Sequence, residues 1–231
     1  MKAKRIIMSF IGVIITAVSV GIFKLAAFGT DPFQSLMSGL DMLIPISFGT
    51  LYVIVNMLLL IFSLIFDRHN IGFATFVNMF LLGYITEYTV KLLNILFPAP
   101  SLLVRAVALV IGVVTICLGL ALYMTADLGV STYDAVSLVL ANKWKVARFG
   151  VCRIITDIVC VIAGAVLFLI AGGAPSDIPT VIGIGTIITA FFMGPLIELF
   201  SAKLVRPMLY GRGGAAEAAQ NESAPSAESE S

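Results

Sequence analysis

The sequence predicts an all-α protein, a polytopic transmembrane helical bundle of two homologous repeats, each with its helices in the order long, short, long, long. Three observations lead to this prediction. The composition is too apolar for a soluble domain, the apolar residues gather in segments of membrane-crossing length, and motifs of the first half recur in the second. About eight helical segments are therefore expected.

The composition identifies lipid as the solvent for most of the chain. Of the 231 residues, 60% are hydrophobic and 12% are charged, whereas soluble domains average about 45–50% apolar and roughly 25% charged. A soluble domain of this size could not bury so much apolar surface. Residues 1–210 hold thirteen Lys and Arg against nine Asp and Glu, an excess too small and too dispersed to predict nucleic-acid binding.

The helical segments follow one another in a regular order. Six are near the ~20 residues that a helix needs to cross ~30 Å of hydrocarbon, and they cover 6–28, 48–66, 71–96, 102–126, 149–171 and 179–204. Two shorter stretches, 32–44 and 132–142, each follow the first long segment of a half. Residues 211–231 lack an apolar period and are rich in Ala, Ser, Glu and Gly, so a disordered cytoplasmic tail is expected there.

Residue matches between the halves predict a duplication. Glycines and threonines in step are harder to obtain by chance than aligned apolar residues. The matches are spaced by 100 to 111 residues, and they pair Gly12 with Gly112, Gly29 with Gly129, Phe48-Gly49 with Phe149-Gly150, and Ile71-Gly72-x-x-Thr75 with Ile182-Gly183-x-x-Thr186. The sequence therefore predicts membrane repeats over 1–98 and 99–210.

The short segments decide whether the repeats are parallel or inverted. The helix expected at 32–44 rises about 20 Å. Only Pro45-Ile46-Ser47 separate it from the next long segment, and three extended residues span at most about 11 Å. We therefore expect no re-entrant hairpin, so that the short helix either crosses the membrane or lies flat on it. The distribution of Lys and Arg barely separates these two topologies, and it favours eight passes, parallel repeats and both termini in the cytoplasm.

The first candidate site is the entry to each short helix, Gly29-Thr30-Asp31-Pro32 in one half and Gly129-Val130-Ser131-Thr132 in the other. Asp31 and Ser131 are residue types that cap helix N-termini. Capping alone would explain them, because lipid offers no hydrogen bonds. In the alternative interpretation, the two related N-termini face one another and their partial positive charges hold a polar or anionic group, as in transporters.

Polar side chains within the apolar segments form the second candidate site. Gln34 and Asp134 occupy equivalent positions in the two halves, as do Asn56 and Asp157. Ionisable groups within a bilayer are costly and usually face a partner or a water-filled cavity. Asp157 has Arg153 four residues earlier, so an ion pair within the helix is the alternative to a solute site. Asp134 has no opposite charge within its own helix, and it is the acid expected to act in a site.

Signatures of enzymes are absent from the sequence. It contains one histidine, His69, and neither an HExxH nor a GxSxG motif. Cys117, Cys152 and Cys160 lie in apolar runs without a CxxC or a Cys/His cluster, and we interpret them as packing residues. The sequence therefore predicts no enzyme, and no catalytic residue, cofactor, metal ligand or ATP-binding motif.

Several of these motifs together resemble a known group. They are the Gly-Thr-Asp-Pro turn at 29–32, the Gly-Val-Ser-Thr-Tyr-Asp-Ala turn at 129–135, the Phe-Gly pairs leading to Asn56 and Asp157, and the Ile-Gly-Ile-Gly-Thr run at 182–186 with Gly194-Pro195. Over residues 1 to about 205, the chain resembles the YczE/YyaS/YitT group of bacterial multi-pass membrane proteins. It is closest to the YczE type, since it has a tail where YitT-type members carry a soluble domain. The resemblance implies residence in the bacterial inner membrane and a transport or export role, but no substrate.

We therefore expect a secondary transporter, permease or exporter for a small polar or anionic solute in the bacterial plasma membrane. Its site would lie between the repeats, lined by Asp31, Gln34, Asn56, Ser131, Thr132, Asp134 and Asp157. The alternative is a non-transporting scaffold or assembly factor that binds another membrane protein, in which these residues are caps and interhelical contacts. Besides the lipid bilayer, the expected partners are such a membrane protein or a second copy of the chain.

Overall fold

The computed structural model describes residues 2–68, 71–147 and 149–210, and every regular element in these ranges is a helix. The long helices are α1 (Lys2–Ala26), α3 (Phe48–Phe66), α4 (Phe73–Leu96), α5 (Leu102–Thr125), α7 (Phe149–Ile170) and α9 (Ile184–Phe200). The short helices are α2 (Pro32–Leu43) and α6 (Thr132–Leu138), the second continued by the π-helical η1 (Val139–Lys143). The predicted segment 179–204 is interrupted at residues 182–183, between α8 (Ile178–Val181) and α9. The 3₁₀ turn η2 (Pro175–Asp177) precedes α8, and the π-helical η3 (Ser201–Val205) follows α9.

The predicted class, a helical membrane protein, is confirmed. Five helices are long and apolar enough to cross a membrane: α1, α3, α4, α5 and, over residues 151–170, α7. Large apolar side chains on these helices are exposed, among them Leu58, Ile95, Leu103 and Ile170. An exposed apolar surface of this extent would cause aggregation in water, and it is suited to contact with lipid.

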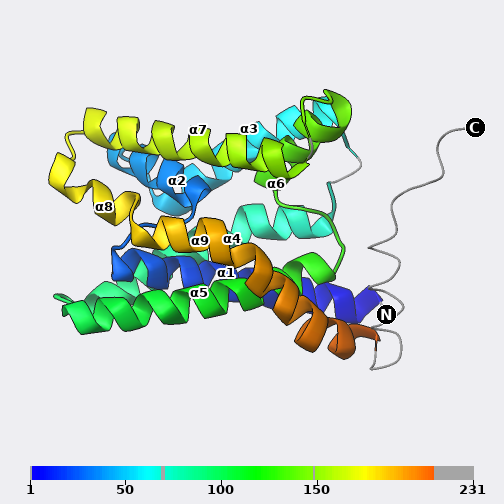
Figure 1. The fold of residues 1–231 in the computed structure, drawn as a ribbon, viewed down its shortest axis with the longest axis horizontal. Coiled ribbons are helices and arrows are strands. Elements are labelled where there is room, and N and C mark those ends of the chain that lie inside the picture. The colour runs from blue at the N-terminus through cyan, green and yellow to red at the C-terminus, as the bar shows by residue number, and fades with distance from the viewer. Residues whose placement is uncertain (1, 69–70, 148, 211–231) are drawn as a thin grey trace, which may run out of the picture.

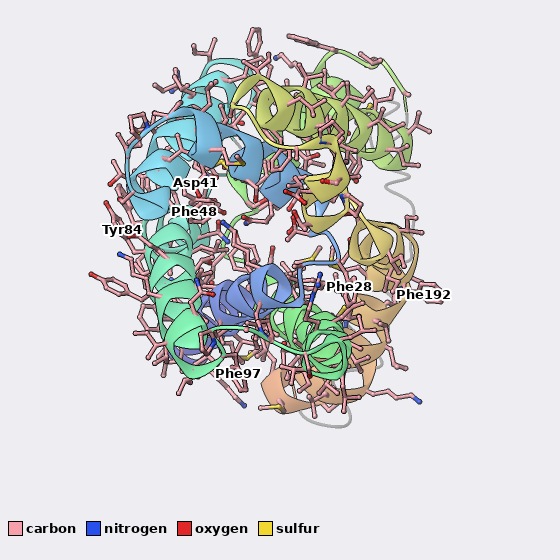
Figure 2. The ribbon with its side chains drawn as sticks, turned by 90° about the vertical axis from the view of Figure 1, so that its left-hand side faces the viewer. Phe28, Asp41, Phe48, Tyr84, Phe97 and Phe192 are labelled. Carbon is pink, nitrogen blue, oxygen red and sulfur yellow. The ribbon has the colours of Figure 1, made fainter. Side chains whose placement is uncertain are left out.

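Two groups of helices lie side by side. In one group, α1 packs against α4 and α5, and α5 against α9; in the other, α2 packs against α7 and α3 against α6 (Figure 1). Contacts between α3 and α4 join the two groups. Figure 2 looks onto the end of the molecule at which α1 finishes, and Asp41 and Phe48 are labelled on the α2–α3 side of that end. We call this the Phe48 end and the opposite one the Trp144 end.

The helices α1 and α5 run antiparallel. Ser19 Oγ donates to Thr115 Oγ1 over 2.8 Å, and Arg105, at the start of α5, donates to the carbonyl oxygen of Ala26, at the end of α1, also over 2.8 Å. Parallel repeats of four passes each would place these two helices in the same direction. The expectation of parallel repeats is therefore wrong, because α5 begins at the end of the bundle at which α1 finishes.

Both short helices begin in the middle of the bundle. Phe33, at the start of α2, stacks on Tyr133, at the start of α6, with ring centroids 5.0 Å apart. Thr132 donates to Asn56, halfway along α3, and Tyr133 OH donates to Asp157, well inside α7. The starts of α2 and α6 are therefore level with the centres of the long helices.

From this midpoint the two short helices run to opposite ends. The chain leaving α2 reaches Phe48 at the start of α3, where Lys24 Nζ of α1 lies 3.5 Å from the ring centroid. The chain leaving η1 reaches Trp144, whose ring packs edge-on against Phe62 and Phe66 at the end of α3. Each short helix thus returns to the end at which the preceding long helix finished.

The extended residues before each short helix make the inward leg. After α1 the backbone turns at Ala27 and Gly29, with φ of 51° and 91°, and then runs inward to the cap of α2. The expectation that reach excludes a re-entrant segment is wrong, because it considered only the three residues after the helix. The helix itself makes the return, so α2 and α6 each run from the middle of the bundle back to the end at which the preceding long helix finished.

Each inward loop packs against the start of a long helix in the other half. A Cβ at Gly29 would lie 2.3 Å from Gly183 N, and one at Gly129 would lie 2.5 Å from Gly72 N. With φ of 91° and 113° at these two positions, only glycine fits without strain. Backbone bonds repeat the pairing: Gly185 N donates to Phe28 O over 2.7 Å, and Ala74 N donates to Leu128 O over 3.0 Å.

Both ends of the described chain lie at the Trp144 end. Arg5 Nη2 donates to Tyr210 OH over 2.9 Å, and Lys4 donates to the carbonyl oxygen of Met208. The predicted tail over 211–231 lies outside the described residues. The division into 1–98 and 99–210 stays a prediction, and the contacts show that the two halves are interleaved rather than separate bodies.

Candidate functional site

Charged side chains meet where α2 and α6 begin. Arg153 of α7 forms an ion pair with Asp134 of α6 through Nη1, and its Nε lies 3.3 Å from Asp157 Oδ1. The guanidinium also lies over the ring of Tyr133, with Cζ 4.4 Å from the centroid. One arginine thus binds two carboxylates and an aromatic face, from two different helices.

Side-chain caps fix the starts of both short helices. Asp31 Oδ1 accepts from Gln34 N over 3.1 Å, and Pro32 occupies the first helical position. In the other half Ser131 Oγ accepts from Asp134 N over 3.1 Å and donates to Asp134 Oδ2 over 2.7 Å. Each N-terminus therefore has a carboxylate of its own beside it, which offsets the partial positive charge of the helix end.

Hydrogen bonds tie the start of α6 to the long helices on either side. Thr132 Oγ1 donates to Asn56 Oδ1, and Asn56 Nδ2 donates to the carbonyl oxygen of Tyr52 over 2.8 Å. Tyr133 OH donates to Asp157 Oδ1 over 2.6 Å. Thr132 and Asn56 are almost fully buried. These bonds hold the site in one geometry, because a buried polar group that loses its partner is costly.

On the α2 side of the site, the side-chain oxygen of Gln34 is a buried hydrogen-bond acceptor without a donor. Gln34 is 3% exposed, and its Oε1 has no hydrogen-bond partner. Asp31 is near enough to Arg153 and Asp157 to interact electrostatically with both, yet its hydrogen bonds come from the backbone of α2. The site therefore contains three carboxylates against one guanidinium, together with an unpaired amide oxygen.

The structure brings the seven residues predicted from the sequence into one region. Asp134 has no charged partner within its own helix, as the sequence indicates, but it forms an ion pair with Arg153 of α7. The ion pair between Arg153 and Asp157, the alternative to a solute site, is present as well. Sequence reasoning missed Tyr133 and the bridging role of Arg153. The signal that could have identified Tyr133 is its place in the Gly-Val-Ser-Thr-Tyr-Asp-Ala turn, between the predicted site residues Thr132 and Asp134.

Among the described residues, no group of three His, Cys, Asp or Glu side chains has an arrangement that could hold a metal ion. Cys117, Cys152 and Cys160 are all free and buried, as expected for packing residues.

The comparisons with known proteins concern the family. The model of a family described as "Family of unknown function (DUF6198)" matches residues 3–202. The uncharacterized protein YyaS of Bacillus subtilis is 25% identical over 199 residues, which is 86% of this chain and 93% of that protein. An uncharacterized protein of Haemophilus influenzae is 23% identical over 181 residues, 78% of this chain and 75% of that protein. The resemblance to the YyaS group is confirmed. No solved structure matches the chain.

Proposed function

The chain belongs to DUF6198, a family of unknown function, and from the geometry of its site we propose that it is a secondary transporter for a small polar solute. The observation that carries the proposal is the meeting of two half-length helices at the centre of the bundle, beside three carboxylates and one arginine. Transporters built from inverted repeats place their solutes at such interrupted helices near the bilayer midplane.

The matched contacts support an inverted repeat. Gly29 meets Gly183 as Gly129 meets Gly72, and Arg105 bonds Ala27 O as Arg5 pairs with Asp127. In each case, one contact becomes the other when every residue is replaced by its equivalent in the other half, at the same offsets of 100 and 111 residues that the motifs predict. Two halves with three passes each would be related by an axis in the membrane plane, the symmetry that alternating access uses.

The charges favour a solute that carries positive charge or donates hydrogen bonds. The sequence also allowed an anionic solute, held by the two helix N-termini. Those N-termini already have Asp31 and Asp134 beside them. With Asp157 added, the carboxylates outnumber Arg153 three to one, and Gln34 Oε1 is a free acceptor. An ammonium group or another strong donor would complement this set, because opposite charges attract strongly in a partly dry site.

Charge also supports an orientation in the membrane. Of the described Lys and Arg residues, Lys24, Lys91 and Arg105 lie at the Phe48 end, Arg153 lies in the site, and the remaining eight lie at the Trp144 end. Positive residues accumulate on the cytoplasmic side. We therefore place the Trp144 end, with both termini, in the cytoplasm of a bacterial cell and the chain in its plasma membrane.

Ligand-dependent stability followed by flux tests the proposal. The purified protein is reconstituted in lipid nanodiscs, and its unfolding midpoint is measured with small ammonium compounds, neutral amides and carboxylates. A solute that binds only the folded protein stabilises it by about 2.7 kcal/mol at a hundredfold excess over Kd. We expect a saturable rise with ammonium compounds, lost in Asp134→Asn and retained in Asp177→Asn, a matched change at an exposed acid.

Flux into proteoliposomes then separates a transporter from a binding scaffold. The compound that stabilises the protein should accumulate in vesicles that contain the parent and not in vesicles that contain Asp134→Asn. Stabilisation without any flux would favour the scaffold. If no compound in the panel shifts the midpoint, the solute site itself is refuted.

A further inference from the structure

An apolar pocket lies beside the charged site, between α2, α3, α6 and α7. Its volume is about 280 Å³, and its lining includes Phe33, Leu59, Tyr133 and Val159. The surface that it offers is apolar throughout.

The pocket and the charged site share a wall. Tyr133 lines the pocket with its ring, while its OH donates to Asp157 and its face carries the Arg153 guanidinium. Thr156, one residue before Asp157, also lines the pocket. A molecule that placed a charged group at the carboxylates would therefore have an apolar space next to it, across one aromatic ring.

The pocket also borders the outer surface of the bundle. Ile155 and Val159, which line it, are 44% and 60% exposed on α7. This face of α7 is apolar, with Ile158 and Ile162 exposed as well. An apolar chain could therefore enter from the lipid without crossing a charged surface.

We infer that the solute is an amphiphilic amine, whose ammonium group binds on the side of the charged site formed by Asp134 and Asp157 and whose apolar part fills this pocket. The inference rests on the proposed function, and it names the substrate class. A phospholipid is a poorer occupant, because its phosphate would face three carboxylates against one arginine. A small hydrophilic cation would leave the pocket unused.

A chain-length series tests the inference. The affinities of n-alkylammonium chlorides from methyl to hexyl are measured on the protein in nanodiscs, with empty nanodiscs to subtract partitioning into lipid. Each buried methylene should tighten binding by about fourfold. Val159→Trp, which fills the pocket, should abolish this gain while methylammonium binds as to the parent, which also shows that the variant is folded. Val166→Trp, two turns along α7 at an exposed position outside the pocket, should leave the series unchanged.

The outcomes separate the inference from the proposed function. If ethylammonium binds and longer chains add nothing, the inference is overturned and the transporter for a polar solute stands. If hexanoate binds as tightly as hexylammonium and is equally sensitive to Val159→Trp, the pocket holds acyl chains regardless of charge, and the inference is again overturned. If no ammonium compound binds but a neutral amide stabilises the protein, the inference is overturned and the transporter for a polar solute stands; if nothing in either series binds, the proposed function falls as well.

Discussion

Replacing Gly29 by alanine tests the packing of the inward loop against α9. Two costs are expected. The residue has a φ of 91°, where a side chain costs about 1–2 kcal/mol. The new Cβ would also lie 2.3 Å from Gly183 N and 2.6 Å from Thr186 Oγ1. Overpacking of this kind costs about 1–3 kcal/mol, so Gly29→Ala should lower the free energy of unfolding by about 2–5 kcal/mol in total.

Gly172 provides the matched control. Its φ of 89° is nearly the same as that of Gly29, but a Cβ there would meet no atom within 4 Å. Gly172→Ala should therefore show the backbone cost alone, about 1–2 kcal/mol. The free energies are measured on the purified proteins in detergent micelles, by titration with a denaturing detergent. Equal losses in the two variants would refute the close approach of the loop to α9, and with it the re-entrant path of residues 27–31.

Three further predictions follow from the topology and the site. The variants Lys4→Cys and Lys91→Cys should react with membrane-impermeant maleimides from opposite sides of the membrane, since the two residues lie at opposite ends of the bundle. Labelling of both cysteines from the same side would favour the eight-pass topology instead. Arg153→Gln should lower the free energy of unfolding by about 1–3 kcal/mol, less than the ~3–5 kcal/mol expected for a fully buried pair, because the Arg153 side chain is 30% exposed. Adding Asp134→Asn should restore part of this free energy in a double-mutant cycle. Additive losses would contradict the ion pair. The fluorescence of Trp144, the one tryptophan, should be quenched by lipids labelled near the head group and much less by lipids labelled near the chain end.

The helices were predictable from the sequence because their signal is local. The expected segments 48–66, 71–96 and 102–126 lie within two residues of α3, α4 and α5. The start of α2 was also readable, since Asp31 and Pro32 are a cap and a first-turn residue by type. The break at Gly183 was not predicted, because the residues on both sides of it are as apolar as a continuous helix requires.

The directions of the helices were not predictable in the same way. Five residues of loop can be a connection on the surface or an inward leg, and only long-range contacts decide between them. For residues 27–31 the deciding contacts come from Gly183 and Gly185, more than 150 positions away. The partner of Asp134 was hidden for the same reason, since Arg153 is sequence-adjacent to Asp157 rather than to α6.

The bond between Phe28 and Gly185 has a consequence for the biosynthesis of the protein. The first inward loop leaves the ribosome long before its packing surface exists, because Gly183 and Gly185 are made near the end of the chain. Until then, the hydrogen bond that the Phe28 carbonyl accepts in the folded protein cannot form, and an unpaired backbone group is costly in lipid. The long helices α1, α3 and α4 have all they need to insert as they are synthesised. The loop at 27–31, and the site that begins with it, can be completed only after the start of the last long helix has been synthesised.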